Sequence, residues 1–487
     1  MDLMQLIDRQ AQVRPEAIAL IRGASVVTFW QLAAAIRNLA THLAAQGIAP
    51  GDRVGIAMGQ TPFHVIVILA LARIGAVSLP VHARHPAGTR KAIVDHFTPV
   101  TIVAGREKDR VEGCSLLLAD PSWLRKPAEA KLPPTDEDMG DRAWRINLSS
   151  GTTGLPRGVL RTHNDLVTQI LFEASVVRFD AGTRFLCAMD VNLGASLRRV
   201  LRHLTAGGAV IFTESTSWDA VEAVLASNQP THSFVSPGFL SGRIRELGER
   251  RAPCPALTYV AGGGGCLSPA LRQRVAEQIT PNVFSVYGST ESGWMAMQYP
   301  DDPQLEPESV GRVVPWAEMQ VVDAGDNPLP AGEQGHLRFR GHGFATSYYE
   351  NPEATARFFR DGWFYPGDIG RVSPRGFLFI DTREDDMLNV GGLKVMPGES
   401  EGVLAAHPAV AEAAVFRTAS ASGEEFLVAA VVKREEVDDK ALLEYCREKL
   451  GPRSPHRVVS VRELPRDAMG KVLRSELVKK IKSRGAK

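Results

Sequence analysis

An alternation of helical stretches with short apolar runs covers about the first 380 residues of this chain and limits its fold more than any other feature. Residues 29–46 have the spacing of apolar side chains that is typical of a helix, whereas residues 54–58 and 209–212 have the length and composition of buried strands. Helices that alternate with strands predict parallel sheets covered by helices. We therefore expect a large N-terminal domain of layered α/β sheets.

The alternation ends in two steps, which predict the domain boundaries. Between residues 318 and 341, short strands flank a segment rich in Gly and Pro, which predicts a small β unit. Residues 381–386 then form a dense charged segment that interrupts the hydrophobic pattern. We place the boundary there, between an N-terminal domain at residues 1–384 and a small α+β C-terminal domain at residues 385–487. The elements expected after residue 318 are strands at residues 319–323, 336–340, 413–417 and 426–433 and a helix at residues 399–407.

Size and charge indicate a protein of more than one domain whose partner is a small molecule. A single core stops growing well below 487 residues, so two or more domains are expected. The 56 basic and 55 acidic residues leave no overall field that would favour nucleic acid or an anionic membrane. The cysteines lie far apart without a Cys-x-x-Cys pair, which argues against a zinc or redox site and predicts reduced, packed thiols. These cysteines are Cys114, Cys187, Cys254, Cys266 and Cys446.

The N-terminal segment and the most apolar run of the chain both favour a cytoplasmic location. Residues 1–9 carry acidic side chains within their apolar stretch and lack a basic flank, so no secretory signal is predicted. Residues 65–72 form the most apolar run, but a helix needs about 20 residues to span a bilayer. This run predicts a buried helix and no insertion into a membrane.

Residues 147–158 combine glycines, hydroxyls and one cation in a single short loop. Glycines let backbone N–H groups turn toward an anion, hydroxyls add donors, and Arg157 supplies a permanent positive charge. Val159 follows Gly158 where a Walker A loop has Lys, which excludes that class of phosphate loop. An ordinary turn is the alternative, and it is the more frequent one for such a loop taken alone. The candidate phosphate-binding residues are Ser149, Ser150, Gly151, Thr152, Thr153, Gly154 and Arg157.

Residues 283–293 are an apolar run that opens into a polar loop, which is where α/β proteins bind ligands. Tyr287 could stack on a base, Thr290 could donate a hydrogen bond to a phosphate, and Glu291 could hold Mg²⁺, which takes one or two carboxylates plus phosphate oxygens. The alternative is a hairpin turn with an exposed glutamate. Both interpretations fit this segment equally well.

Two further residues become informative only through their position after these loops. Asp368 follows a Pro-Gly turn, where its carboxylate could accept hydrogen bonds from both hydroxyls of a ribose, although Asp is common in turns for local reasons. Lys471 follows a glycine near the C-terminus. An isolated lysine of this kind is nearly always a surface residue.

In order and spacing these segments resemble the adenylate-forming superfamily, which comprises acyl- and aryl-CoA synthetases, peptide-synthetase adenylation domains and firefly-type luciferases. The resemblance runs from about residue 10 to residue 475. Any single motif is weak, but at least seven in the right order are specific. The stretches that also take part are residues 262–268, 310–312, 332–335 and 348–355.

The resemblance implies a role for each candidate residue. The loop at residues 149–158 would close over the β- and γ-phosphates of ATP, Thr290 would contact the α-phosphate, and Glu291 would hold Mg²⁺. Lys471 would bridge the substrate carboxylate and the α-phosphate, and Asp385 would be the hinge of a mobile C-terminal domain. The other implied contacts are an adenine slot at Gly263, Gly264, Gly265 and Tyr287, nucleotide binding by Gly288 and Ser289, a ribose site at Asp368 and Arg383, and a tunnel for the thiol at Gly391 and Gly392.

The implied reaction is ATP-dependent activation of a carboxylic acid to an acyl-adenylate with release of pyrophosphate, followed by transfer to the thiol of CoA. ATP, Mg²⁺ and CoA are the expected cofactors. The chain departs from the commonest family pattern at three positions. Arg157 replaces a lysine and keeps its charge, Pro366 stands where threonine is frequent, and Asn389 removes a cation from the presumed thiol side.

The pocket for the carboxylic acid is expected around residues 187–194, where this chain lacks the usual Phe-His pair. If Asp190 enters the pocket, it could pair with the amino group of a substrate. If Asn192 enters instead, an uncharged aryl or acyl acid fits better. Trp294 is expected either to cap this pocket or to be an ordinary packed tryptophan.

The acceptor of the acyl group is expected to be CoA. Residues 385–392 look more like CoA ligases, including the benzoate-type group, than like peptide-synthetase domains. The chain ends soon after Lys471 without a fused carrier domain, so a separate acyl carrier protein loaded with an amino or aryl acid is the second alternative. A non-catalytic nucleotide or acyl-CoA sensor is the third, and the presence of both Lys471 and Glu291 argues against it.

Overall fold

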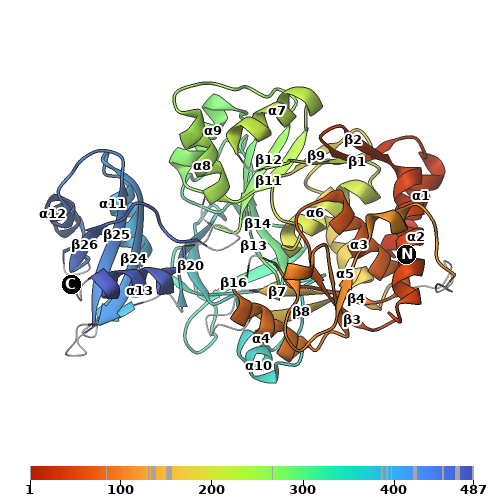
Figure 1. The fold of residues 1–487 in the computed structure, drawn as a ribbon. Coiled ribbons are helices and arrows are strands. Elements are labelled where there is room, and N and C mark those ends of the chain that lie inside the picture. The colour runs from red at the N-terminus through yellow and green to blue at the C-terminus, as the bar shows by residue number, and fades with distance from the viewer. Residues whose placement is uncertain are drawn as a thin grey trace. The chain divides into compact units, whose positions relative to one another are not determined.

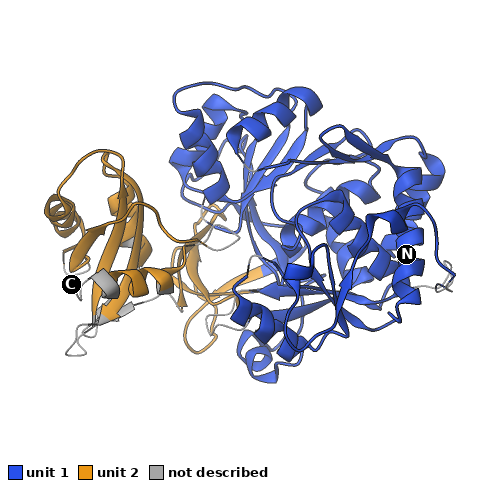
Figure 2. Cartoon of the chain, in the orientation of Figure 1, with its two compact units in different colours: residues 1–318, 339–364 blue, residues 319–338, 365–487 orange. Residues whose placement is uncertain are grey.

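The computed structural model describes residues 2–83, 85–129, 132, 139–149, 156–215, 217–265, 267–384, 388–390, 393–395, 397–419, 425–451, 454–466 and 472–484. The chain divides into two compact units (Figure 2). Unit 1 comprises Met1–Glu318 and Phe339–Phe364, and unit 2 comprises Met319–Arg338 and Tyr365–Lys487. The functional boundary expected at residue 385 stays a prediction.

Unit 1 is built on two sheets whose strands are mainly parallel (Figure 1). The first has the order β15-β14-β13-β12-β11-β9-β10-β1-β2, and only its outer pairs β1/β2, β13/β14 and β14/β15 are antiparallel. Its strands are β1 (Ile18–Arg22), β2 (Ser25–Thr28), β9 (Arg184–Cys187), β10 (Ala209–Phe212), β11 (His232–Val235), β12 (Tyr259–Gly263), β13 (Val283–Ser289), β14 (Gly293–Gln298) and β15 (Arg312–Val313). The predicted parallel α/β layers are confirmed.

The second sheet of unit 1 has the order β6-β5-β3-β4-β7-β8, with β7 and β8 antiparallel. Its strands are β3 (Arg53–Ala57), β4 (Val77–Pro80), β5 (Thr101–Ala104), β6 (Leu116–Leu118), β7 (Ala143–Ser149) and β8 (Arg157–Thr162). The α-helices of unit 1 are α1 (Leu3–Val13), α2 (Phe29–Ala45), α3 (Pro62–Ile74), α4 (Ala87–Phe97), α5 (His163–Ala174), α6 (Gly194–Thr205), α7 (Trp218–Asn228), α8 (Pro237–Leu247), α9 (Pro269–Gln278) and α10 (Pro352–Phe358), and two 3-10 turns span Glu107–Asp109 and Pro121–Leu124.

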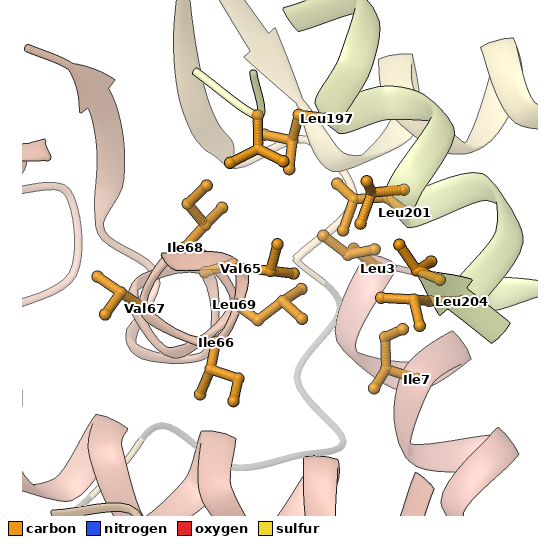
Figure 3. Close-up of a cluster of buried hydrophobic side chains, with 14 of the residues drawn as sticks. Leu3, Ile7, Val65, Ile66, Val67, Ile68, Leu69, Leu197, Leu201 and Leu204 are labelled. Atoms are coloured by element: carbon orange, nitrogen blue, oxygen red, sulfur yellow. The ribbon is translucent and has the colours of Figure 1, made fainter. Parts of the chain in front are cut away.

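Helix α3 is the buried helix that the most apolar run of the sequence predicts. The Thr61 side chain caps its first turn by accepting a hydrogen bond from the His64 N–H, Pro62 occupies the first helical position, and Gly75 ends it with φ of 85°. Figure 3 shows Val65 and Leu69 of α3 lying toward Leu3 of α1 and the leucines of α6. Within the part of the chain that the structure describes, no helix combines the length and the apolar character needed to cross a membrane.

Unit 2 contains a short β region and a small α+β region. Within unit 2, strand β20 pairs antiparallel with β21 and with the first residues of β17. Within unit 1, strand β19 pairs antiparallel with β18 and with Phe339 of β17. The three strands β24-β25-β26 form the sheet of the α+β region. The bounds are β16 (Ala317–Val322), β17 (Gly335–Gly341), β18 (Phe359–Arg360), β19 (Trp363–Phe364), β20 (Asp368–Val372), β21 (Leu378–Arg383), β22 (Leu388–Val390), β23 (Leu393–Val395), β24 (Val410–Ala419), β25 (Glu425–Lys433), β26 (Arg457–Ser460), α11 (Pro397–Ala405), α12 (Asp439–Leu450) and α13 (Arg474–Arg484). The elements predicted after residue 318 coincide with β16, β17, α11, β24 and β25.

The cysteines behave as the sequence predicts over the described residues. Cys187, Cys254 and Cys446 are free and buried, and Cys114 is free and half-buried. Burial raises the pKa of the Cys187 thiol to about 12, so this thiol stays protonated at neutral pH. Cys266 lies outside the described residues.

Candidate active site

The predicted phosphate loop connects two antiparallel strands, β7 and β8, whose ends pair Ser149 with Arg157. The Ser149 hydroxyl is buried and has no hydrogen-bond partner among the described residues. Because an unpaired buried hydroxyl is costly, it is a natural donor for an anion held by the loop. The predicted residues that lie outside the described part of the chain are Ser150, Gly151, Thr152, Thr153 and Gly154.

The segment with Tyr287, Thr290 and Glu291 is a hairpin between β13 and β14, closed by the pair Ser289 and Gly293. The turn is stabilised by its own serines, since Ser289 Oγ lies 3.0 Å from Ser292 Oγ and accepts a hydrogen bond from the Glu291 N–H at 3.2 Å. The hairpin alternative is therefore right about the backbone. It is wrong about the side chain, because Glu291 is only 5% exposed.

Gly288 has a structural role in this hairpin. A Cβ at Gly288 would lie 2.0 Å from the carbonyl oxygen of Gly293, so no other residue fits there without moving the backbone. The packing of the hairpin accounts for this glycine without any ligand.

Arg161 on β8 holds the turn from the other side. Its guanidinium donates hydrogen bonds to the carbonyl oxygens of Thr290 at 2.8 Å, Glu291 at 2.7 Å and Gly343 at 3.0 Å. Burial lowers the pKa of Arg161 to about 10, so the side chain remains cationic at neutral pH. No local sequence motif indicates this role for Arg161.

Tyr348 links the predicted metal ligand to the predicted phosphate-loop cation. Its hydroxyl donates a hydrogen bond to Glu291 Oε1 at 2.7 Å, and both side chains are buried. The guanidinium carbon of Arg157 lies 4.8 Å from the centre of the Tyr348 ring and 4.2 Å from that of Phe358. These cation–π contacts hold Arg157 against Tyr348, which also binds Glu291. The structure thus brings the predicted site residues Arg157 and Glu291 together through Tyr348.

The environment of Glu291 fits a divalent cation. Its carboxylate is buried and forms no ion pair with any described residue. The buried Arg161 guanidinium interacts with this carboxylate electrostatically, and a bound cation would add a direct partner of opposite charge. No group of three or more His, Cys, Asp or Glu side chains that could hold a metal occurs among the described residues. Mg²⁺ does not require one, since it uses one or two carboxylates plus phosphate oxygens.

The predicted adenine slot lies at the carboxyl ends of two adjacent parallel strands. Gly263 at the end of β12 pairs with Val286 of β13, so Tyr287 follows directly on the neighbouring strand. The side chain of Tyr287 is half-buried, with its ring centre 6.0 Å from that of Phe339. Gly264 is exposed and has φ of 80°, and a side chain at Gly265 would meet nothing closer than 3.8 Å. These positions lie at the carboxyl ends of adjacent strands, which is where α/β proteins bind nucleotides.

Asp368 and Arg383 pair in unit 2, where they stand opposite each other on β20 and β21. Asp368 Oδ1 lies 3.1 Å from Arg383 Nε, and Arg383 Nη2 donates a hydrogen bond to the Pro366 carbonyl oxygen at 2.6 Å. The backbone N–H of Glu384 donates to the carbonyl oxygen of Gly367 at 2.7 Å. The structure therefore places both predicted ribose-binding residues on one face of one hairpin.

Both oxygens of the Asp190 carboxylate are hydrogen-bonded within the protein. Its Oδ2 lies 2.7 Å from His82 Nε2, and its Oδ1 accepts hydrogen bonds from the backbone N–H and the side-chain amide of Asn192, both at 2.9 Å. Burial alone would raise the pKa of Asp190, but the hydrogen bonds from His82 and Asn192 bring it down to about 2. Asp190 is thus ionised and already paired.

Asn192 and Trp294, the other two predicted pocket residues, are also buried. Asn192 has one unused group, because its Oδ1 is buried with no hydrogen-bond partner. Arg145 Nη2 donates a hydrogen bond to the Asn192 carbonyl oxygen at 3.1 Å, and burial lowers the pKa of Arg145 to about 9. Trp294 is 2% exposed and packs its ring near Trp316.

Four predicted residues, besides those of the phosphate loop, lie outside the described part of the chain. They are Asp385, Gly391, Gly392 and Lys471. Their roles stay predictions.

Comparison with known families decides the class of protein. The family model described as AMP-binding enzyme matches residues 7–349, and the model described as AMP-binding enzyme C-terminal domain matches residues 399–471. This chain belongs to the AMP-binding enzyme family. The family is one of AMP-forming ligases and places the chain in the adenylate-forming superfamily, as the motifs predict.

Relatives of this AMP-binding enzyme align over nearly all of its length. Enterobactin synthase component E of Escherichia coli strain K12 is 28% identical, with 97% of this chain and 93% of the relative covered. The salicylyl-CoA synthase / salicylate adenylyltransferase of a Streptomyces species is 30% identical, with 96% and 91% covered. Among solved structures, o-succinylbenzoate CoA synthetase from Bacillus subtilis in complex with its acyl-adenylate intermediate has a TM-score of 0.87 at 24% identity, with 97% of each chain covered. This last likeness shows the fold.

Sequence reasoning missed three residues that shape the candidate site of this AMP-binding enzyme. They are Arg161, which holds the 290–291 turn, Tyr348, which holds Glu291, and His82, which holds Asp190. Only Tyr348 had a signal, since it lies in one of the stretches that carry the family resemblance. Arg161 and His82 act through contacts across the fold that no local motif marks.

Proposed function

We propose that this enzyme activates a carboxylic acid with ATP to give an acyl-adenylate and pyrophosphate, and then transfers the acyl group to the thiol of CoA. The observation that carries the proposal is the buried carboxylate of Glu291, which forms no ion pair with a described residue and is held by Tyr348 beside the phosphate-loop cation Arg157. The family membership supports the same reaction class.

The first half-reaction joins two anions. A carboxylate oxygen of the substrate attacks the α-phosphorus of ATP, the bond from that phosphorus to the bridging oxygen breaks, and pyrophosphate leaves. Fixed cations and donors must offset the repulsion and align the groups. Magnesium, when bound, would withdraw charge from the phosphate oxygens.

Different residues of this chain would offset the charge repulsion and align the groups at the two ends of the triphosphate. Glu291 would hold the metal, Thr290 would donate to the α-phosphate, and Arg157 with Ser149 would bind the departing phosphates. Lys471 would contact the attacking carboxylate and the α-phosphate. Gly263 to Gly265 and Tyr287 would take the adenine, and Asp368 with Arg383 the ribose.

The second half-reaction transfers the acyl group. The CoA sulfur attacks the acyl carbon, the bond from that carbon to the phosphate oxygen breaks, and AMP leaves. We propose that residues 385–487 reorient about Asp385 between the two steps, and that Gly391 and Gly392 let the thiol arm pass close to the backbone. A cytoplasmic location, where ATP and CoA are available, completes the proposal.

The state of Asp190 supports an acid without an amino group. Both oxygens of its carboxylate already accept hydrogen bonds, so a substrate ammonium would compete with His82 and Asn192 for them. The buried Oδ1 of Asn192 is free to accept a hydrogen bond from a substrate hydroxyl. An aryl or acyl acid is therefore favoured, in agreement with the relative named salicylyl-CoA synthase.

Loading of a separate carrier protein is the second candidate. It is supported by the relative enterobactin synthase component E of Escherichia coli. Both candidates share the first half-reaction and differ only in the thiol that receives the acyl group.

The test is pyrophosphate release from ATP and Mg²⁺ over a panel of aryl, aliphatic and amino acids, with and without CoA. Release with at least one acid and formation of its CoA thioester are expected, and Glu291→Gln should abolish most of the release. Absence of release with every acid would refute the proposal. Release without any thioester would favour the carrier-protein alternative.

A further inference from the structure

Helix α6 buries three arginines against a single glutamate. Arg202 is completely buried and Arg198 is 11% exposed, and both contact Glu173 of α5, which is 2% exposed. Glu173 Oε1 lies 2.9 Å from Arg198 Nε, and Glu173 Oε2 lies 2.9 Å from Arg202 Nη1. The two oxygens of this carboxylate are therefore occupied by residues that stand one helical turn apart.

Arg199 lies between these two arginines in the sequence, and it forms no ion pair with a carboxylate among the described residues, although Glu173 acts on it electrostatically. It is 1% exposed, and its hydrogen bond runs from Nη1 to the Ala195 carbonyl oxygen at 2.7 Å. Its Nε is buried without a partner. The guanidinium carbon lies 3.6 Å from the centre of the Phe234 ring and 5.4 Å from that of Trp294. Aromatic faces support a cation but do not neutralise it.

This cluster carries an excess of positive charge. Three arginines face one glutamate, which leaves two positive charges uncompensated in a buried region. Burial lowers the pKa of Arg199 to about 9, so the side chain still carries its charge at neutral pH. Buried charges without a partner are costly, and an anionic ligand would offset part of that cost.

The cluster adjoins the predicted acid pocket. Helix α6 starts two residues after Asn192, and the ring of Trp294 lies within 5.8 Å of the guanidinium carbons of both Arg199 and Arg202. A Cβ at Gly293 would lie 3.4 Å from Arg198 Nη1. The arginines of α6 thus lie directly behind the hairpin that carries Thr290 and Glu291.

A small cavity in the same region is lined in part by arginines. It measures about 20 Å³ and is enclosed in part by Arg145, Arg161 and Arg198. None of its described lining residues is an aspartate or glutamate. A volume of this size holds one or two water-sized groups. Such a cavity suits the end of an electron-rich substituent.

We propose that α6 forms a cationic subsite of the acid pocket, and that this enzyme prefers carboxylic acids with a second anionic group, which Arg199 and Arg198 bind. The inference rests on the proposed function, because it names the class of acid that the adenylation step takes. The second anion would offset the excess charge of the cluster, while the first carboxylate remains free to react at the Glu291 end. Specificity would then come from charge as well as shape.

The test compares acids that differ only in the second carboxylate, namely hexanoate with adipate and benzoate with terephthalate. We expect kcat/KM for pyrophosphate release to be at least about tenfold higher for the dicarboxylate in one pair, as pairing of a buried charge allows. Arg199→Met should lower that preference by about tenfold, and Arg199→Lys should retain most of it. Arg178→Met, which changes a side chain that is 92% exposed, is the matched control and should leave the preference unchanged.

Two results would overturn the inference. One is a wild-type preference for the monocarboxylate in both pairs, which needs no variant and so does not depend on whether Arg199→Met folds. The other is an equal loss of activity on both members of a pair in Arg199→Met, at an unchanged unfolding temperature. Failure of every acid to release pyrophosphate would instead refute the proposed function itself.

Discussion

The Tyr348 hydroxyl donates a hydrogen bond of 2.7 Å to Glu291 Oε1, and the two residues are 57 positions apart in the sequence. The same tyrosine ring supports Arg157 through a cation–π contact. One side chain therefore fixes both the proposed metal ligand and the proposed phosphate-loop cation. A residue that hydrogen-bonds to a metal-ligating side chain sets the orientation of that side chain. Loss of such a residue commonly weakens metal binding by about 10- to 100-fold.

Tyr348→Phe should raise the Mg²⁺ concentration needed for half-maximal pyrophosphate release by about tenfold, because the ring stays and only the donor is lost. A Mg²⁺ titration at saturating acid measures this effect. Tyr349→Phe removes the hydroxyl of the adjacent tyrosine and serves as the control. An unchanged Mg²⁺ dependence in Tyr348→Phe would show that the hydrogen bond does not support a metal site.

Arg161→Met should unfold more easily than the wild type by about 3 kcal/mol, because it leaves the carbonyl oxygens of Thr290, Glu291 and Gly343 without their buried donor. It should also lose most pyrophosphate release, since these bonds hold the turn in place. Urea unfolding and the activity assay measure the two effects. If the turn were held by its serines alone, Arg161→Met would keep full activity.

The layered fold follows from local sequence patterns, whereas most roles in the candidate site follow from the resemblance to the adenylate-forming superfamily. The helix at residues 65–72 is apolar on every face, which predicts burial wherever it packs. The hairpin at Glu291 is one of the two alternatives that the sequence predicts, and the structure confirms its backbone. Local pattern alone did not decide that the glutamate would be buried.

Contacts between distant segments were beyond local reasoning. His82 reaches Asp190 across 108 positions, and neither residue belongs to a motif that names the other. Because His82 and Asn192 already bind the Asp190 carboxylate, this carboxylate is not a free partner for the amino group of a substrate. The arginines of α6 are visible in the sequence. Only the structure shows that the single negative charge of Glu173 faces the positive charges of three arginines.

Lys471→Ala should reduce adenylation by about 10²- to 10³-fold, as expected for the loss of one fixed charge that stabilises the transition state. Thiolysis of preformed acyl-adenylate should survive, because the α-phosphate is no longer under attack by a carboxylate. Measuring the two half-reactions separately tests this. Lys479→Ala, a change at an exposed lysine of α13, is the control, and a parallel loss of both half-reactions in Lys471→Ala would contradict the assigned role.

Asp385→Pro should spare either adenylation or thiolysis but not both, because a proline fixes the backbone at the proposed hinge. Asp385→Ala removes the same side chain without that restriction and should support both steps. The two half-reactions are again measured separately. Normal turnover by Asp385→Pro would mean that no rotation about this residue is required.

The pairing of Asp190 should make stability depend on pH in a specific window. Its pKa is about 2 in the folded state and 3.8 ordinarily, so ionised Asp190 stabilises the fold above about pH 4, and this contribution is lost as the pH falls toward 2. The shift corresponds to about 2 kcal/mol. Asp190→Asn should therefore be less stable than the wild type at pH 6 by roughly that amount, and the difference should shrink at pH 3, as followed by urea unfolding. An Asp190→Asn deficit that stays constant between pH 6 and pH 3 would show that the hydrogen bonds from His82 and Asn192 do not favour the ionised form.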